Sequence, residues 1–209
     1  THSTLVEVIC WSIPCIIIGI LATITWISSH QLDPYRPLDV KGKPLIIQVI
    51  ALDWKWLFIY PDQKIAAINF LQIPVNTPVR FLITADAPMN SLQIPQLAGQ
   101  IYAMPGMQTK LNIIAHEMGN YRGFSANISG EGFSDMKFDV KVTSEKEFNS
   151  WVKMAQKSRQ SLTWQSYTQL AQPSQKDPVK YFILGQEDLF NQVMMKFMMP
   201  MKKVEALPK

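Results

Sequence analysis

The side chains best able to bind a metal are few in this sequence of 209 residues. The only cysteines, Cys10 and Cys15, are five residues apart in an apolar stretch, so a helix would not place them close together on one face. No cysteine follows Cys15, which excludes a disulfide framework and a thiolate metal site in the rest of the chain. The three histidines, His2, His30 and His116, lack ligand spacing, and we interpret them as solvated or interfacial.

A methionine-rich stretch near the end is the other candidate for metal chemistry. Thioethers bind copper(I), but clustered methionines more often pack flexibly on a helix, and we favour that interpretation. The sequence contains no phosphate-binding loop, nucleophile–base pattern or recognisable pair of catalytic acids, so a soluble enzyme is disfavoured. The net charge is only +4, without a basic run, which disfavours a nucleic-acid partner. The methionines are Met194, Met195, Met198, Met199 and Met201.

Glu7 is the one acidic residue beside a long apolar segment. The 21 residues from Val8 to Ser28 carry no charge, and as a helix they would extend about 31 Å, enough to cross a bilayer core of ~30 Å. Trp11 and Trp26 lie near the two ends, where tryptophan favours the headgroup region. The stretch is too long for a signal peptide and has no basic n-region. Residues 1–30 are therefore predicted to form a membrane helix.

The remaining chain is expected to position any further site on a β-rich domain. Residues 31–44 are polar and proline-rich and predict an extended linker. Between residues 45 and 143, short β-rich runs alternate with turn residues, which predicts an antiparallel sandwich or barrel. The expected strands are 45–51, 54–60, 65–73, 79–84, 90–95, 110–115, 121–128 and 136–142.

One of these runs is rich in aromatic residues. Its rings occupy every second position, which places them on one face of a strand. Burial in the sandwich core or against a partner protein is the plainest interpretation. The four residues are Trp54, Trp56, Phe58 and Tyr60.

The segment 144–209 is predicted to be a helical arm. Ser144 and Glu147 have the spacing of a capping box, and apolar residues follow at helical intervals. Two more helical stretches are expected, Leu162–Ala171 and Glu187–Met199.

Several strings in this order resemble subunit II of the haem–copper oxidases. They include N90-S-L-Q-I-P95, G106-M107 and the stretch from Tyr121 to Met136. Within that family, D53-W-K-W56, Q100-I-Y-A-M104 and G132-F-S-D-M-K-F138 resemble the quinol-oxidising branch of the cytochrome bo type. The resemblance implies a membrane helix, then an all-β cupredoxin-like Greek-key sandwich over residues 45–143, then an aromatic-rich C-terminal arm. It also implies that residues 1–30 are the second helix of a hairpin whose first helix is not in this chain.

The resemblance also identifies where copper-bearing members hold a dinuclear copper centre. Asn90 and Phe133 replace two histidines, and Ser125 and Ser129 replace the two bridging cysteines. Asn127 replaces a glutamate that binds through its carbonyl, so Met136 alone is retained. Such a copper pair needs bridging thiolates and imidazoles, and serine hydroxyls do not replace thiolates near neutral pH. We therefore expect no metal in this domain.

The resemblance implies a function for the chain as part of a complex. It would be a non-catalytic subunit of a ubiquinol oxidase that reduces O₂ to water and translocates protons. Haems, copper and the quinol site would belong to subunit I, the main partner, with lipids around the helix. The β-domain and arm would lie on the periplasmic side of a bacterial inner membrane. In this family, a glutamate at the position of Glu7 lies at the mouth of a proton pathway, although a polar residue that merely caps the span is the simpler alternative.

Two other functions remain open at this point. A copper-bearing subunit that receives electrons from cytochrome c is disfavoured by the missing ligands. A membrane-anchored cupredoxin-like binding module would need a preserved metal site or pocket motif, and the sequence shows neither.

Overall fold

The computed structural model describes residues 3–33, 35 and 42–198. Two compact units are present, Thr1–Pro37 and Leu38–Lys209, and each is described by itself. Several predicted features lie outside the described residues: half of the linker (residues 34 and 36–41), His2, and the end of the arm with Met199 and Met201. How Leu38–Lys209 divides into a β-domain and an arm stays a prediction.

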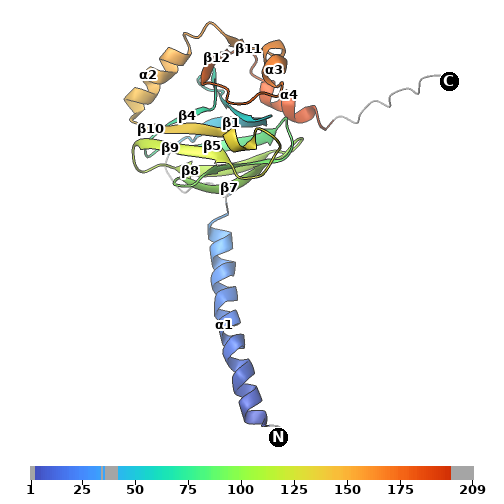
Figure 1. Ribbon diagram of the computed structural model, residues 1–209. Coiled ribbons are helices and arrows are strands. Elements are labelled where there is room, and N and C mark those ends of the chain that lie inside the picture. Colours follow the sequence, from blue (N-terminus) through green and yellow to red (C-terminus); the bar gives the residue numbers. More distant parts are fainter. Residues whose placement is uncertain (1–2, 34, 36–41, 199–209) are drawn as a thin grey trace, which may run out of the picture. The chain divides into compact units, whose positions relative to one another are not determined.

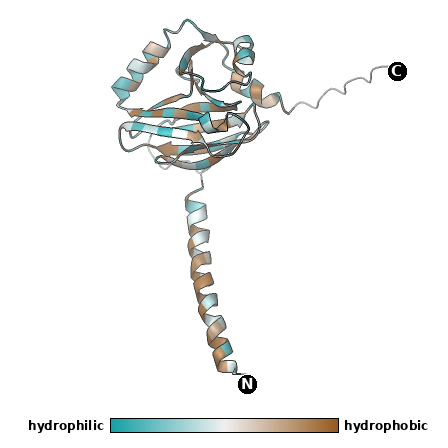
Figure 2. Cartoon of the chain, viewed as in Figure 1, coloured by the Kyte–Doolittle hydropathy of each residue, from teal (hydrophilic) through white to brown (hydrophobic). Residues whose placement is uncertain are grey.

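The described residues of the first unit form one helix, α1 (Thr4–Gln31), of 28 residues. Its most apolar 18-residue window has a mean hydropathy of 2.4, and none of that window is buried. Figure 2 shows the apolar colouring along most of its length. A helix of this length extends about 42 Å, so it is long and apolar enough to cross a membrane. It contains the predicted span Val8–Ser28.

The second unit is built on two β-sheets that face each other (Figure 1). One sheet has seven strands in the order β11-β12-β3-β2-β1-β5-β8, in which β11 (Ser161–Leu162) and β12 (Lys180–Leu184) come from the predicted arm. The other has five in the order β4-β10-β9-β6-β7. Most neighbours are antiparallel, but three pairs are parallel: β1 with β5, β10 with β4, and β11 with β12. The strands of the expected β-domain are β1 (Leu45–Leu52), β2 (Lys55–Tyr60), β3 (Ile65–Ile68), β4 (Phe70–Pro74), β5 (Pro78–Ala85), β6 (Asn90–Ile94), β7 (Ala98–Ala103), β8 (Thr109–Ile114), β9 (Gly119–Ser125) and β10 (Lys137–Thr143).

Strand β2 has every residue buried, because both of its faces are covered. Trp56, Phe58 and Tyr60 point into the core between the two sheets. Leu57 and Ile59, on the opposite face, belong to a second core. The predicted period-2 alternation of the aromatic rings therefore holds from Trp56 onward.

Trp54 departs from that alternation. Leu52 pairs with Lys55 across the hairpin, so Asp53 and Trp54 form a two-residue turn rather than part of the strand. Trp54 has φ +82°, a left-handed conformation that is uncommon for a bulky residue. The prediction that all four aromatic residues share one strand face was therefore wrong for Trp54.

The predicted single strand 65–73 is two strands. Asn69 has φ +53°, and it turns the chain out of the seven-stranded sheet as β3 ends and into the five-stranded sheet as β4 begins. Its side-chain Oδ1 accepts a hydrogen bond from the backbone N–H of Trp56 at 2.8 Å. Asparagine tolerates this conformation better than most residues, which explains its use at the corner.

Tyr60 fastens the two sheets together near the same corner. Its hydroxyl donates to the carbonyl oxygen of Gln72 at 2.9 Å and accepts from the Gln72 N–H at 3.0 Å. Burial raises the pKa of this phenol, so Tyr60 stays protonated and keeps its donor.

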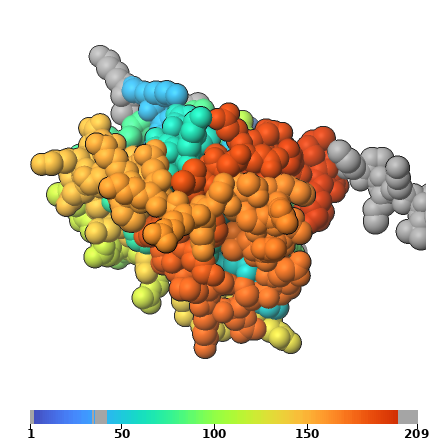
Figure 3. All heavy atoms as spheres, turned by 90° about the horizontal axis from the view of Figure 1, so that it is seen from above, coloured from blue at the N-terminus to red at the C-terminus, as the bar shows by residue number. Residues whose placement is uncertain are grey.

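The part of the arm from residue 161 onward covers the outer face of the seven-stranded sheet, whereas the helix 145–155 packs onto the core between the sheets. Figure 3 shows the orange and red segments of the arm spread over one side of the unit. The expected capping box is present, with Ser144 and Glu147 bonded reciprocally. Two short strands in the arm were not expected, and one of them, β12, pairs with β3. Strand β7 was also missed, because its Gly99, Gln100 and small residues have little β propensity. The arm consists of α2 (Glu145–Ala155), β11 (Ser161–Leu162), α3 (Trp164–Leu170), β12 (Lys180–Leu184) and α4 (Leu189–Met195).

Two glycines of β9 offer a test of packing between the sheets. A Cβ added at Gly123 would lie 2.0 Å from the buried Phe138 ring, whereas one at Gly119 would lie 3.5 Å from Tyr121. We expect Gly123→Ala to lower the free energy of unfolding by about 1–3 kcal/mol through overpacking. Gly119→Ala is the matched control and should change it by less than ~0.5 kcal/mol. Denaturant unfolding of the two variants measures the difference, and equal effects would contradict this packing.

Candidate functional site

The six positions predicted from copper-bearing relatives lie on neighbouring strand ends and one loop. Asn90 begins β6, Ser125 ends β9, and Met136 immediately precedes β10. All three are buried. Asn127 and Ser129 belong to the loop after β9, and Phe133 begins a short 3₁₀ turn, η1 (Phe133–Asp135).

Hydrogen bonds join three of these residues. The Ser125 hydroxyl donates to Oδ1 of Asn90 at 3.0 Å and also lies within hydrogen-bond distance, 3.3 Å, of the Asn127 carbonyl oxygen. The side-chain amides of Asn90 and Asn127 donate to the short link between β5 and β6. Asn90 bonds the Pro88 carbonyl at 2.7 Å, and Asn127 bonds the Met89 carbonyl at 2.8 Å. The loop is thus held by side-chain amides and a hydroxyl.

Trp54 holds the next part of the loop. Its indole N–H donates to the Ser129 carbonyl at 3.2 Å. A Cβ at Gly132 would lie 2.6 Å from the indole, so glycine is needed for this close approach. The Ser129 hydroxyl is buried and has no hydrogen-bond partner in the described part of the chain. Sequence reasoning did not foresee that Trp54 leaves the strand to contact this loop.

This set of donors does not fit a dinuclear copper centre. Ser125 uses its hydroxyl hydrogen as a donor to Asn90, whereas a bridging ligand would be an anionic sulfur. Phe133 offers no lone pair, and Met136 packs in the core between the sheets. Among the described residues, no group of three or more His, Cys, Asp or Glu side chains could hold a metal ion.

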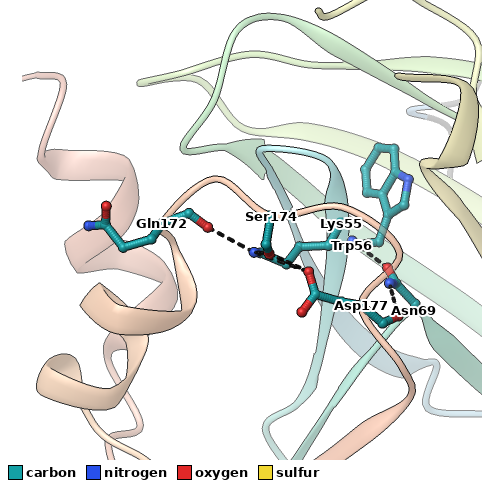
Figure 4. Close-up of polar contacts among 6 residues, drawn as sticks. All are labelled: Lys55, Trp56, Asn69, Gln172, Ser174 and Asp177. Carbon is teal, nitrogen blue, oxygen red and sulfur yellow. Dashed lines mark hydrogen bonds and ion pairs between the residues drawn. The ribbon is translucent and has the colours of Figure 1, made fainter. Parts of the chain in front are cut away.

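A second polar cluster, drawn in Figure 4, was missed by the sequence reasoning. Lys55 is only 2% exposed. Its ammonium donates to the Gln172 carbonyl at 2.9 Å and to the Ser174 hydroxyl, and it lies 3.4 Å from Asp177. Asn69 donates to the Asp177 carbonyl at 3.0 Å. The sequence feature that could have predicted this cluster is the single lysine between Trp54 and Trp56, in an otherwise apolar strand. A buried charge must be paired, so such a lysine predicts a polar partner nearby.

A third cluster centres on Asp86. Its carboxylate accepts from the Tyr167 hydroxyl at 2.8 Å and from the Lys196 ammonium at 2.7 Å. Burial and the nearby Asp86 charge raise the pKa of the Tyr167 phenol. Burial, and then repulsion from Asp86, raise the pKa of the Asp53 carboxyl, and Lys55 opposes this shift.

Glu7 lies in the first turn of α1. It borders a shallow hollow of about 430 Å³, together with Trp11, Cys15 and two residues between them. Glu7, Trp11 and Cys15 follow each other at four-residue intervals, so they share one face of the helix.

The fold and two sequence matches define the class of protein. Residues 62–143 match the family model described as the periplasmic domain of cytochrome c oxidase subunit II, and residues 156–201 match the model described as the COX aromatic-rich motif. The periplasmic domain of cytochrome oxidase subunit II from Bradyrhizobium japonicum superposes with a TM-score of 0.52 at 23% identity, over 55% of this chain and 96% of that one. This likeness shows the cupredoxin-like fold.

Closer relatives narrow the class. The chain is 53% identical to cytochrome bo(3) ubiquinol oxidase subunit 2 of Buchnera aphidicola, over 92% of its own length and 68% of the relative. It is 50% identical to the Pseudomonas aeruginosa protein of the same description, over 94% of this chain and 59% of that protein. The chain thus spans about three fifths to two thirds of the length of these relatives. It belongs to the ubiquinol oxidase subunit 2 family.

The Lys55–Asp177 pair generates a stability prediction. Asp177→Ala would leave the ammonium buried without its carboxylate and should lower the free energy of unfolding by roughly 3–5 kcal/mol. Lys55→Met should cost less, because Asp177 retains 15% of its side-chain exposure and can regain water.

The matched control is Lys64→Met. Lys64 and Glu187 form an exposed pair between the same sheet and the arm, at 2.9 Å with side chains 64% and 76% exposed. Its loss should cost less than ~1 kcal/mol. Chemical denaturation measures all three variants, and a cost for Asp177→Ala no larger than that for Lys64→Met would contradict the role of the buried pair.

Proposed function

We propose that this chain acts as a non-catalytic subunit of a membrane-bound ubiquinol oxidase, which oxidises ubiquinol, reduces O₂ to water and translocates protons. Membership of the ubiquinol oxidase subunit 2 family supports this function. The main structural support comes from Ser125 and Ser129. These residues occupy both bridging-ligand positions and bear hydroxyls, within a loop held by hydrogen bonds. A domain with those residues has no electron-accepting metal centre, so electrons would enter the complex elsewhere.

In such a complex, the cofactors lie in subunits other than this chain. Haems, copper and the quinol site belong to subunit I, which is the principal partner. Helix α1 is long and apolar enough to anchor the chain in the membrane, and the match to a periplasmic-domain family supports a periplasmic position for the β-domain and arm. The chain's own part is to stabilise subunit I and to form the outer face of the complex.

The proposal is tested on the purified complex that contains this chain. We expect one copper per complex, and oxygen uptake with ubiquinol but not with reduced cytochrome c. Elemental analysis and oxygen-electrode assays with both donors measure this. Three coppers per complex, or rapid oxidation of cytochrome c, would show that the domain carries a metal centre and would overturn the proposal.

We further propose that Glu7 contributes to proton uptake by the complex. A carboxylate at the edge of a membrane helix can collect protons and pass them inward. Glu7→Gln removes the exchangeable charge while keeping nearly the same shape, so turnover should fall about tenfold or more. The oxygen electrode and stopped-flow haem reduction measure the effect.

Thr23→Ala is the matched control on the same helix, because the Thr23 hydroxyl bonds the Gly19 carbonyl at 2.8 Å and lies more than four helical turns from Glu7. Haem content and subunit composition verify that both variant complexes assemble. Normal turnover of an intact Glu7→Gln complex would leave Glu7 as a polar cap of the span and nothing more.

A further inference from the structure

Asp86 is a buried carboxylate in the short link between β5 and β6. Its side chain is 3% exposed. Both side chains that bind it come from the arm: Tyr167 lies on α3, and Lys196 immediately follows α4. The Asp86 backbone N–H donates to the Ala51 carbonyl at 2.9 Å, which fixes this end of the link against β1.

The other end of the same link is hydrogen-bonded to the loop 125–136, which corresponds to the copper-binding loop of copper-bearing relatives. The carbonyls of Pro88 and Met89 accept from Asn90 and Asn127, and Asn90 in turn accepts from Ser125. The arm contact at Asp86 and the loop contacts at residues 88–90 are therefore separated by only one residue. A shift of this link would move the acceptors that hold the loop.

A second connection runs through the turn between β1 and β2. The Ser174 N–H of the arm donates to the Asp53 carbonyl at 3.2 Å, and the adjacent Trp54 donates to Ser129 in the loop. The arm therefore reaches the loop from two sides, through Asp86 and through this turn.

We propose that Asp86 is a positioning residue that couples the arm to the metal-free loop 125–136, so that docking of α3 and α4 keeps this loop ordered in place of a metal. Lys196 supplies the charge that makes the coupling strong. Without it, Asp86 would be a buried carboxylate with one phenol donor and with Asp53 as a like-charged neighbour. Buried charges that lose their partner are strongly destabilising, so the link would move to bring Asp86 to water.

Hydrogen exchange on the purified complex with the full chain separates this coupling from simple fastening of the arm. Two amides report on the loop: Ser125 donates to the Met136 carbonyl at 3.0 Å, and Ala126 donates to the Ser91 carbonyl at 3.0 Å. We expect Lys196→Met to speed exchange of peptides covering 86–91 and 125–126 by about tenfold. Lys196→Arg, which retains the charge, should restore slow exchange.

Lys64→Met is the matched control, because the exposed pair of Lys64 with Glu187 also ties the arm to the sheet. It should leave the loop peptides unchanged. Tyr167→Phe keeps the ion pair and should produce a smaller increase in the same peptides. An increase confined to α3 and α4 in Lys196→Met, or an equal increase in Lys64→Met, would overturn the proposal. The assay does not depend on turnover, so its outcome is independent of whether the complex oxidises ubiquinol.

Discussion

The burial of β2 on both faces is the constraint on which the folded unit depends. One face of this strand carries aromatic rings and packs against the five-stranded sheet, and the other carries Leu57 and Ile59. Apolar side chains on the second face need a cover as much as those on the first. The arm supplies that cover through α3, α4 and β12, so it completes the second core rather than decorating a finished domain. Because Lys55 lies on this second face, its ammonium also fixes where the arm docks, through Gln172, Ser174 and Asp177.

The local features of this fold could be predicted from the sequence, but its long-range contacts could not. Alternation located most strands, and Ser144 with Glu147 located the start of α2. Those features depend on residues a few positions apart. The corner at Asn69 was hidden because apolar residues run through it without interruption, and β12 was hidden because its strand character comes from pairing with β3. The bonds of Asp86 join residues 81 and 110 positions apart, a separation at which no periodicity in the sequence operates.

The candidate site divides in the same way. The lack of thiolates could be read directly from the sequence, since no cysteine follows Cys15 and serines occupy both bridging positions. The contacts that hold the loop could not be predicted from the sequence, because they depend on the conformation of the chain. Trp54 reaches the loop because it has a positive φ in the β1–β2 turn, and its indole fits because Gly130 and Gly132 have no side chains there. Neither the turn nor the contact follows from residue types alone.

These contacts are what hold the shape of this cupredoxin-like loop in the structure. A metal holds a loop with a few strong bonds to side chains from different strands. Here individually weaker hydrogen bonds join the loop to its neighbours: Ser125 to Asn90, Asn127 to the link before β6, and Trp54 to Ser129. Each is worth only about 0.5–1.5 kcal/mol, so the loop depends on all its neighbours remaining in place. Those neighbours are the β1–β2 turn and the β5–β6 link, and both are bonded to the arm. In this chain the arm and the loop are therefore joined through two shared neighbours, the β1–β2 turn and the β5–β6 link.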